Sequence, residues 1–224
     1  MAEVHPQALA CRAIAFIDGQ NLFRASQDCF GYHFPNYDVR LLAESVCRSS
    51  GWVLVETRFY TGVPDEADDF SWNRFWTAKL AQMGRTQVKV FSRALRYSEK
   101  VIRKPDGTTE TERRPREKGI DVRIALDLVH AAHTGWANVL IIFSQDQDLS
   151  EAVTEVRDIV ASRGGKIQIA CAYPYSEVSA NPARPESPNP RGIDGTKWIK
   201  IPKSEYDMCI DPRDYRPKPP SKTS

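Results

Sequence analysis

Short apolar runs alternate along the chain with segments that show helical periodicity. Five of the runs have about the length of a strand and cover residues 13–17, 52–60, 87–91, 139–143 and 166–172. An apolar run bounded by turn residues is typical of a strand that is buried on both faces, as in a parallel sheet. The pattern therefore predicts a central sheet of about five strands.

Amphipathic segments lie between these runs. Residues 37–47 and 69–83 place apolar side chains at helical spacing, a further helical pattern opens at Asp121, and the clearest apolar face covers residues 149–160. Strands that alternate with helices are typical of βαβ units, whose connecting helices cover both faces of a mostly parallel sheet. The expected fold class is α/β, with three layers.

The composition indicates one main domain with appendages. A chain of 224 residues with 41% hydrophobic and 27% charged residues is long enough for one sizeable core. We expect a main domain over residues 11–173, an insertion at 93–118, and a Pro-rich loop and C-terminal extension at 174–224. Ten of the fifteen prolines fall in this extension, and proline limits regular structure. Within it, residues 197–201 are expected to add a short edge strand or to dock on the core.

Several classes of protein are disfavoured by the sequence. No apolar run is long enough to span a membrane, and the first ten residues lack the basic and apolar regions of a signal peptide, so we expect a cytoplasmic protein. The five cysteines are scattered without a CxxC pair, which disfavours a disulfide framework or a thiolate zinc site. His130 and His133 share a helical spacing, but no third ligand is evident and zinc is rejected. Dinucleotide, P-loop and serine-hydrolase motifs are absent from the sequence.

Four aspartates are placed to meet at one edge of the predicted sheet. Asp18 ends the first strand, Asp146 and Asp148 follow the fourth, and Asp121 begins the helix that leads back to the fourth strand. With the strand order 3-2-1-4-5, the carboxyl ends of strands one and four flank the point where the order reverses, which is where open α/β sheets bind ligands. Clustered carboxylates repel one another unless a hard divalent cation neutralises them. The pattern predicts a metal site.

Each aspartate taken singly also has a structural interpretation. Asp18 with Gly19 is compatible with a strand-to-loop turn, Asp146 or Asp148 with a helix cap, and Asp121 with an ordinary acid in a first helical turn. The metal-site interpretation depends on the coincidence of three separate segments that place aspartate on the same predicted edge.

Carboxylate-held divalent ions suit the hydrolysis of phosphodiester bonds. This reaction needs a deprotonated water in line with the leaving oxygen and positive charge beside the phosphoryl oxygens. It needs no side-chain nucleophile. We assign Asp18, Asp121 and Asp146 to metal binding and Asp148 to a second metal or to the activation of water, and the number of metals stays open.

Three ordered motifs contain these aspartates. They are Phe16-Ile17-Asp18-Gly19-Gln20-Asn21-Leu22, then Lys118-Gly119-Ile120-Asp121-Val122 with Asp127 further along the helix, and Ser144-Gln145-Asp146-Gln147-Asp148-Leu149. The motifs resemble those of the NYN domain, which belongs to the PIN-like nuclease superfamily, and the resemblance spans about residues 13–173. Gln145 stands where relatives often have a small residue, and Leu149 where an aromatic residue is common.

The resemblance implies a Mg²⁺- or Mn²⁺-dependent ribonuclease with a PIN-like, three-layer fold. Carried over position by position, Asp18, Asp121, Asp146 and Asp148 are the catalytic residues and the metal ligands, directly or through water. By the same resemblance Asn21 and Ser144 orient water, metal or phosphate. Asp127 does not share a helix face with Asp121 and is at most a supporting residue.

The insertion at 93–118 is locally basic. It carries nine basic and five acidic residues, although the net charge of the whole chain is only +2. Pro105-Asp106-Gly107 is a turn signal between two short segments, so a basic β-hairpin is expected to overhang the acidic edge. The side chains expected to contact RNA are Arg103, Lys104, Arg113 and Arg114 on the phosphates, Tyr97 by stacking, and Lys118 on a phosphate near the site. A solvated charged loop is the alternative.

Two functions from different classes remain open at this point. The first is a metal-dependent ribonuclease, a phosphodiester hydrolase acting on single-stranded or loop RNA. The second is a non-catalytic adaptor that binds RNA or protein on the same fold. Such a relative is expected to lose acidic positions, and this chain has lost none of the four. A DNA nuclease or phosphatase at the same edge is a third alternative. Whether the chain binds a partner protein or a second copy of itself is left open.

Overall fold

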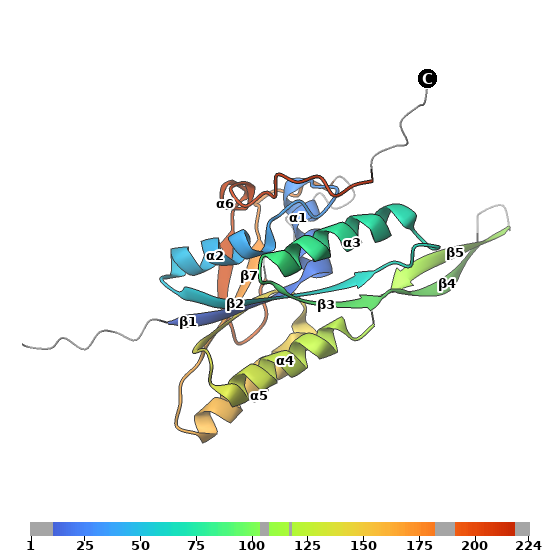
Figure 1. The fold of residues 1–224 in the computed structure, drawn as a ribbon. Coiled ribbons are helices and arrows are strands. Elements are labelled where there is room, and N and C mark those ends of the chain that lie inside the picture. The colour runs from blue at the N-terminus through green and yellow to red at the C-terminus, as the bar shows by residue number, and fades with distance from the viewer. Residues whose placement is uncertain (1–10, 104–107, 117, 182–190, 218–224) are drawn as a thin grey trace, which may run out of the picture.

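A six-stranded parallel sheet forms the centre of the protein (Figure 1). The computed structural model describes residues 11–103, 108–116, 118–181 and 191–217. The strand order is β3-β2-β1-β6-β7-β8, and every neighbouring pair is parallel. The strands are β1 (Arg12–Asp18), β2 (Val53–Val63), β3 (Lys89–Ala94), β6 (Val139–Phe143), β7 (Gln168–Pro174) and β8 (Lys197–Ile201). The prediction of an α/β fold with a mostly parallel sheet is confirmed, including the order of its first five strands.

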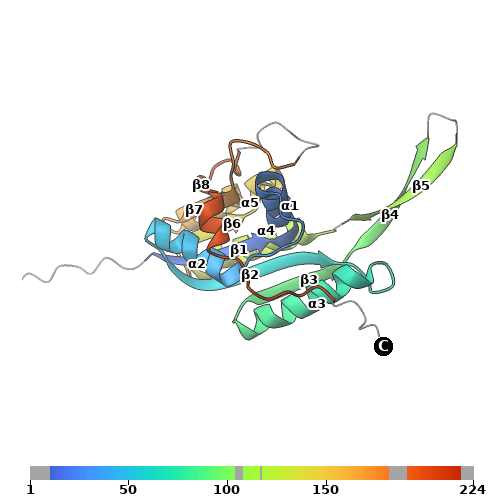
Figure 2. The same ribbon diagram turned by 90° about the horizontal axis from the view of Figure 1, so that it is seen from above.

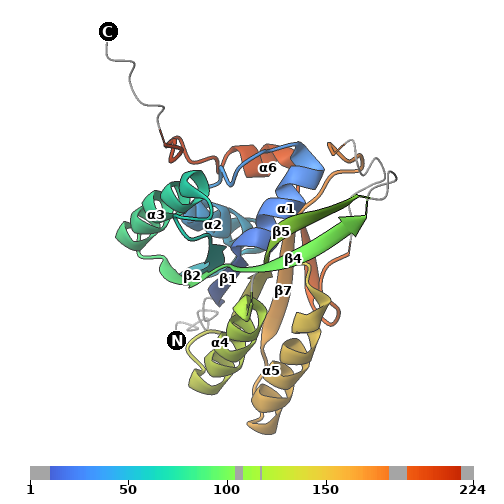
Figure 3. The ribbon, with the colours of Figure 1, turned by 90° about the vertical axis from the view of Figure 1, so that its right-hand side faces the viewer.

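Helices cover both faces of the sheet and give the three layers. Figure 1 and Figure 3 show α4 and α5 on one face and α1, α2 and α3 on the other. The helices are α1 (Gly19–Phe30), α2 (Val39–Ser50), α3 (Phe70–Arg85), α4 (Ile120–Thr134), α5 (Ser150–Ser162) and the short α6 (Lys203–Asp207), with one 3₁₀ turn, η1 (Gln147–Leu149).

The central strand β1 explains why the apolar runs are continuous. Successive side chains of a strand point to opposite faces. Ala15 and Ile17 join the core beneath α1, α2 and α3, whereas Ile14 and Phe16 join the core beneath α4 and α5. All four are almost completely buried. Both faces of β1 therefore require apolar residues, and no polar alternation is left in the sequence.

Helix α1 was not predicted. Asp18 and Gly19 suggest a turn, but Asp18 is the N-cap of this helix, and its side chain accepts a hydrogen bond from the backbone N–H of Asn21. Gly19 lies so close to β2 that a Cβ there would collide with the ring of Phe59. A residue without a side chain is therefore required where α1 leaves the sheet.

An antiparallel hairpin occupies the insertion between β3 and α4. Strands β4 (Arg96–Arg103) and β5 (Thr109–Arg116) pair as a separate two-stranded sheet, and the turn at 104–107 lies outside the described residues. Figure 1 and Figure 2 show that the hairpin projects from the side of the molecule toward which β1 runs. It therefore extends beyond the carboxyl edge of the central sheet.

The C-terminal segment is part of the core. Strand β8 pairs in parallel with β7, and Ile201, Tyr206 and Cys209 are almost fully buried against the α1–α3 face. Lys79 of α3, which is 2% exposed, donates to the carbonyl oxygen of Tyr37 at 2.8 Å and lies 3.9 Å from the carboxylate of Asp211. Of the two expectations for residues 197–201, the edge strand is the one that the structure shows.

None of the helices in the described part of the chain combines the length and the apolar character needed to cross a bilayer.

Candidate functional site at the carboxyl edge of the sheet

Strands β1 and β6 end side by side at the point where the strand order reverses. Their last paired residues are Ile17 and Phe143, so Asp18 and Ser144 leave the sheet next to each other. Connections from these two strands run in opposite directions along the sheet, toward β2 and toward β7. Such a switch point leaves a crevice outside the carboxyl ends of the strands.

Hydrogen bonds join the two chain segments that leave the sheet here. The hydroxyl of Ser144 donates to Oδ2 of Asp18 at 3.4 Å and accepts from the backbone N–H of Asp146 at 3.2 Å. The side-chain oxygen of Asn21 accepts from the backbone N–H of Gln145 at 2.9 Å. Ser144 is 1% exposed, so its geometry is fixed by burial as well as by these bonds. Two side chains proposed to orient the site, Asn21 and Ser144, thus hold the acidic loop against β1 and α1.

Asp18 is a buried carboxyl group whose ionisation is unfavourable. Burial is the main cause that raises its pKa from 3.8 to about 6, and the negative charge of Asp146 raises it further. Hydrogen bonds from the backbone of Asn21 and Gln20 and from Ser144 act in the opposite direction. The residue is 7% exposed. A positive charge placed at this edge would stabilise the ionised carboxylates of Asp18 and Asp146 together.

Asp146 and Asp148 occupy the turn after β6. Asp146 is half-buried and caps η1, accepting the backbone N–H of Asp148 on Oδ1 at 3.1 Å. Asp148 is exposed. The capping interpretation of Asp146 is therefore correct, and it holds together with the coupling of its charge to Asp18. The cap uses one carboxylate oxygen, Oδ1.

Asp121 lies in the first turn of α4, which packs against β1 and η1. It is partly exposed and makes no hydrogen bond to the other three aspartates within the described residues. Across the described ranges, no three Asp, Glu, His or Cys side chains lie close enough to enclose an ion. The structure thus couples the charges of Asp18 and Asp146 and places Asp148 on the turn that Asp146 caps, whereas Asp121 lies on a separate element, α4.

The structure describes only some of the basic side chains of the insertion. The carbonyl oxygen of Lys118 accepts from Arg93 at 3.2 Å, and the Lys118 side chain is exposed just before α4. Arg103 is exposed at the end of β4. Arg113 and Arg114 belong to β5, but their side chains lie outside the described residues.

The carboxylate of Asp127 binds side chains that hold helix α4 in place. Its carboxylate accepts from the hydroxyl of Tyr60 at 2.8 Å and from Arg123 at 3.1 Å, and it lies 3.8 Å from Arg58. These contacts tie α4 to β2. Asp127 therefore supports the position of α4 and does not extend the acidic site.

The sequence pattern does not identify two glutamines that hold the acidic turn in place. The Gln145 side chain donates to the carbonyl oxygen of Arg191 at 2.8 Å, and that of Gln147 donates to Gly192 at 3.0 Å and accepts from the backbone of Asp194 at 3.2 Å. The acidic turn is therefore clamped by the segment that precedes β8. Since the partners lie in a distant part of the chain, the only local signal is the unusual Gln145.

A protein-family model and solved structures are similar to the chain. A model of the NYN domain family matches residues 12–162 of the chain. Among solved structures, the chain is similar to a Vibrio parahaemolyticus protein of unknown function, with 15% identity over 90% of this chain and 96% of that chain and a TM-score of 0.47. No curated protein matches the chain.

Proposed function

The chain belongs to the NYN domain family of the PIN-like nuclease superfamily, and on that premise we propose that it is a metal-dependent ribonuclease. The proposed reaction is the hydrolysis of RNA phosphodiester bonds at the carboxyl edge of the sheet. The observation that carries the proposal is the buried carboxyl of Asp18, coupled to Asp146 at the switch point. A buried carboxylate with a second negative charge beside it costs stability unless a cation neutralises the two.

The side chains present fit Mg²⁺ or Mn²⁺. Both ions prefer oxygen ligands, and Mg²⁺ keeps several waters and commonly uses only one or two carboxylates directly. Asp18 and Asp146 would hold the ion directly. Asp121 and Asp148 would do so directly or through water. When bound, the ion supplies positive charge beside the phosphoryl oxygens and lowers the pKa of a water molecule.

The protein's own groups would position the ligands and the substrate. Ser144 fixes the orientation of the Asp18 carboxyl, and Asn21 holds the backbone of Gln145, so both keep the two segments in register. Lys118 would meet a phosphate beside the scissile one as an exposed cation at the start of α4. Arg103, Arg113 and Arg114 on the projecting hairpin would follow the RNA backbone.

We propose that the chain has one nuclease domain with an insertion and a C-terminal extension. Residues 11–173 form the nuclease domain, with the hairpin insertion at 93–118, and residues 174–224 form the C-terminal extension. The extension contributes β8 and buried side chains to the domain, so it is proposed to be required for folding rather than to be a detachable tail.

A non-catalytic adaptor is the second candidate function. The projecting basic hairpin is compatible with it, because phosphate contacts give affinity without cleavage. The retention of Asp18, Asp121, Asp146 and Asp148 favours the nuclease, since an adaptor has no use for a buried carboxylate beside a second negative charge.

A cleavage assay distinguishes the two. Purified protein is incubated with end-labelled RNA and DNA oligonucleotides of the same sequence, with Mg²⁺, with Mn²⁺ and with chelator. Asp146→Asn is compared with Asp158→Asn, a matched change at an exposed position of α5. We expect metal-dependent RNA cleavage that Asp146→Asn reduces by more than about 100-fold, because even partners of metal ligands contribute about 10- to 100-fold. Cleavage that is insensitive to chelator, or equal in both variants, refutes the proposal. Cleavage of DNA in preference to RNA corrects the substrate.

A further inference from the structure

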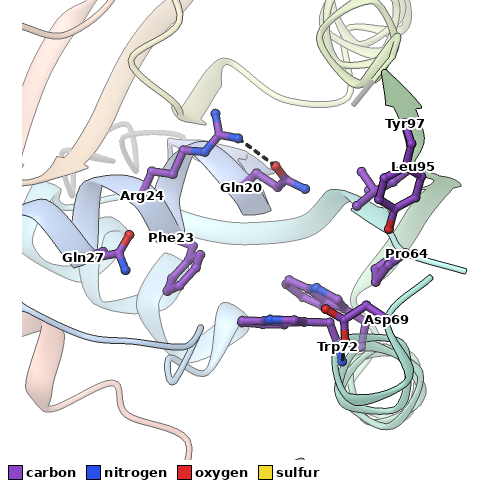
Figure 4. A pocket seen from close by; sticks show the side chains of 11 residues that line it. Gln20, Phe23, Arg24, Gln27, Pro64, Asp69, Trp72, Leu95 and Tyr97 are labelled. Atoms are coloured by element: carbon purple, nitrogen blue, oxygen red, sulfur yellow. Dashed lines mark hydrogen bonds between the residues drawn. The ribbon is translucent and has the colours of Figure 1, made fainter. Parts of the chain in front are cut away.

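A pocket of about 340 Å³ lies next to the acidic site (Figure 4). Its walls come from α1, from the end of β2 and the segment after it, from α3, and from the start of β4. Figure 4 shows Phe23 and Arg24 of α1 on one side and Trp72, Leu95 and Tyr97 on the opposite side. Of the residues that line it, only Gln20 belongs to one of the three acidic motifs.

Gln20 connects the pocket to the acidic site. Its backbone hydrogen-bonds to the carboxylate of Asp18, and its side chain lines the pocket. The opposite wall begins at Gly62, shortly after Tyr60, which pairs with Asp18 across β1 and β2. A strand of nucleic acid with a phosphate at Asp18 would therefore bring a neighbouring nucleotide to the pocket.

The walls of the pocket are aromatic and held in place. The ring centroids of Phe23 and Trp72 are 6.0 Å apart at an interplanar angle of 53°. Trp72 also packs edge-on against Phe75 at 5.3 Å, and its backbone N–H binds the capping carboxylate of Asp69 at 3.0 Å. Tyr97 is half-buried on β4. Rigid aromatic faces of this kind bind planar groups by stacking at a small entropic cost.

The polar groups of the pocket suit a neutral base better than a phosphate. The charges of Arg24 and Asp69 balance, and Arg24 is already paired with the side chain of Gln20 at 3.3 Å. Gln20 and Gln27 offer amide donors and acceptors, which match the hydrogen-bonding edge of a nucleobase. An aliphatic ligand would offer these amides no hydrogen bonds, and a phosphate would find no net positive charge.

From this arrangement we propose that the pocket binds one unstacked base of the RNA strand that is cleaved at the acidic site. The proposal rests on the ribonuclease function proposed above and specifies its substrate class. A base inside a duplex has both faces covered by its neighbours, whereas a base in a single strand or loop can enter an aromatic pocket. The pocket thus selects single-stranded RNA and sets the register between a bound base and the scissile phosphate.

Binding of abasic oligonucleotides tests the pocket without cleavage. The Asp146→Asn protein in chelator serves as the reference, and its affinity is measured for a labelled RNA hexamer and for six versions that each lack one base. Stacking of one base contributes about 1–3 kcal/mol, which corresponds to about 5- to 150-fold in affinity. We expect one position at which loss of the base weakens binding by such a factor. A flat response at all six positions overturns the proposal.

Pocket variants on the same background locate the effect. Tyr97→Ala on the hairpin and Trp72→Leu on α3 are compared with Phe70→Leu, a change to a half-exposed aromatic residue of α3 that does not line the pocket. Each pocket variant should weaken binding of the intact hexamer about as much as removal of the base, and should add no further loss with the abasic hexamer. Fully additive losses overturn the proposal. If Trp72→Leu shifts the thermal unfolding transition, Tyr97→Ala decides.

The failure of this proposal is distinguishable from the failure of the ribonuclease. Metal-dependent cleavage together with a flat abasic response keeps the ribonuclease and removes the base pocket. Base-dependent binding by a protein that cleaves no RNA keeps the pocket and removes the nuclease. Unchanged RNA binding in both pocket variants overturns the proposal.

Discussion

Replacing Asp18 with asparagine should stabilise the metal-free protein at neutral pH. Asparagine retains the shape of the side chain and can still accept the N–H of Asn21, but it has no charge to bury. Burial and the charge of Asp146 raise the pKa of Asp18 from 3.8 to about 6. At about 1.36 kcal/mol for each pKa unit, the penalty for ionising Asp18 in the folded protein is about 3 kcal/mol. The free energy of unfolding should therefore rise by at most this amount in Asp18→Asn.

The gain has a defined pH dependence. Because the folded protein holds the Asp18 proton more tightly than the unfolded chain, wild-type stability from this group falls as pH rises from about 3.8 to about 6. The Asp18→Asn variant has no carboxyl group at this position and does not lose stability in this way. The two proteins should therefore be equally stable near pH 3.5, and the variant should be more stable by up to about 3 kcal/mol at pH 7.

Urea unfolding in chelator at a series of pH values measures the difference. The midpoint should rise in the variant at pH 7 while the slope stays constant, since the surface exposed on unfolding is unchanged. Adding Mn²⁺ should stabilise the wild type and not the variant, because only the former binds it strongly. A gain of equal size at pH 3.5 and pH 7, or no gain at pH 7, would refute the electrostatic account of the site.

Three further predictions concern the residues around the site and the C-terminal segment. Asp211→Asn should destabilise the protein by about 3 kcal/mol at pH 7, because it leaves Lys79 buried without its counter-charge. Burial lowers the pKa of Lys79 to about 8, so the loss measured by urea unfolding should shrink by pH 9, where the lysine is neutral, and a constant loss would contradict this reasoning. Gln147→Ala should speed amide hydrogen exchange at Asp194 and cost about 1–3 kcal/mol, since two hydrogen bonds to the 191–195 segment are lost, whereas unchanged exchange would mean that the clamp is not formed. Changing Arg103, Lys104, Arg113 and Arg114 to glutamine should weaken RNA binding and reduce its salt dependence by about 0.7 in the logarithmic slope for each lost phosphate contact, and an unchanged slope would remove the hairpin from the RNA interface.

The sequence predicts those parts of the fold that need apolar residues on both sides. The run over residues 139–143 coincides with β6, because a strand covered by helices on both faces has no polar positions. Helix α1 was not predicted because its buried face consists of Gly19, Leu22, Ser26 and Cys29, of which only Leu22 is a large apolar residue. Its opposite face carries Gln20, Arg24 and Gln27, which line the pocket.

The candidate site could be predicted in outline but not in detail. The ends of β1 and β6 bring Asp18 and Asp146 together, since the order of parallel strands follows from topology. The position of Asp121 depends on the length and path of the segment after the hairpin, which no periodicity specifies. The clamp by Gln145 and Gln147 and the Lys79–Asp211 pair join segments far apart in the chain, so their partners have no local signature.

The most direct test of the central claim is the binding of Mn²⁺, followed through the electron paramagnetic resonance signal of the free ion, with RNA cleavage measured in the same samples. Wild type and Asp158→Asn are predicted to bind the ion and to cleave RNA, and Asp18→Asn and Asp146→Asn to lose both. Binding of Mn²⁺ and cleavage of RNA by all four proteins alike would contradict the claim that these two carboxylates form the metal site.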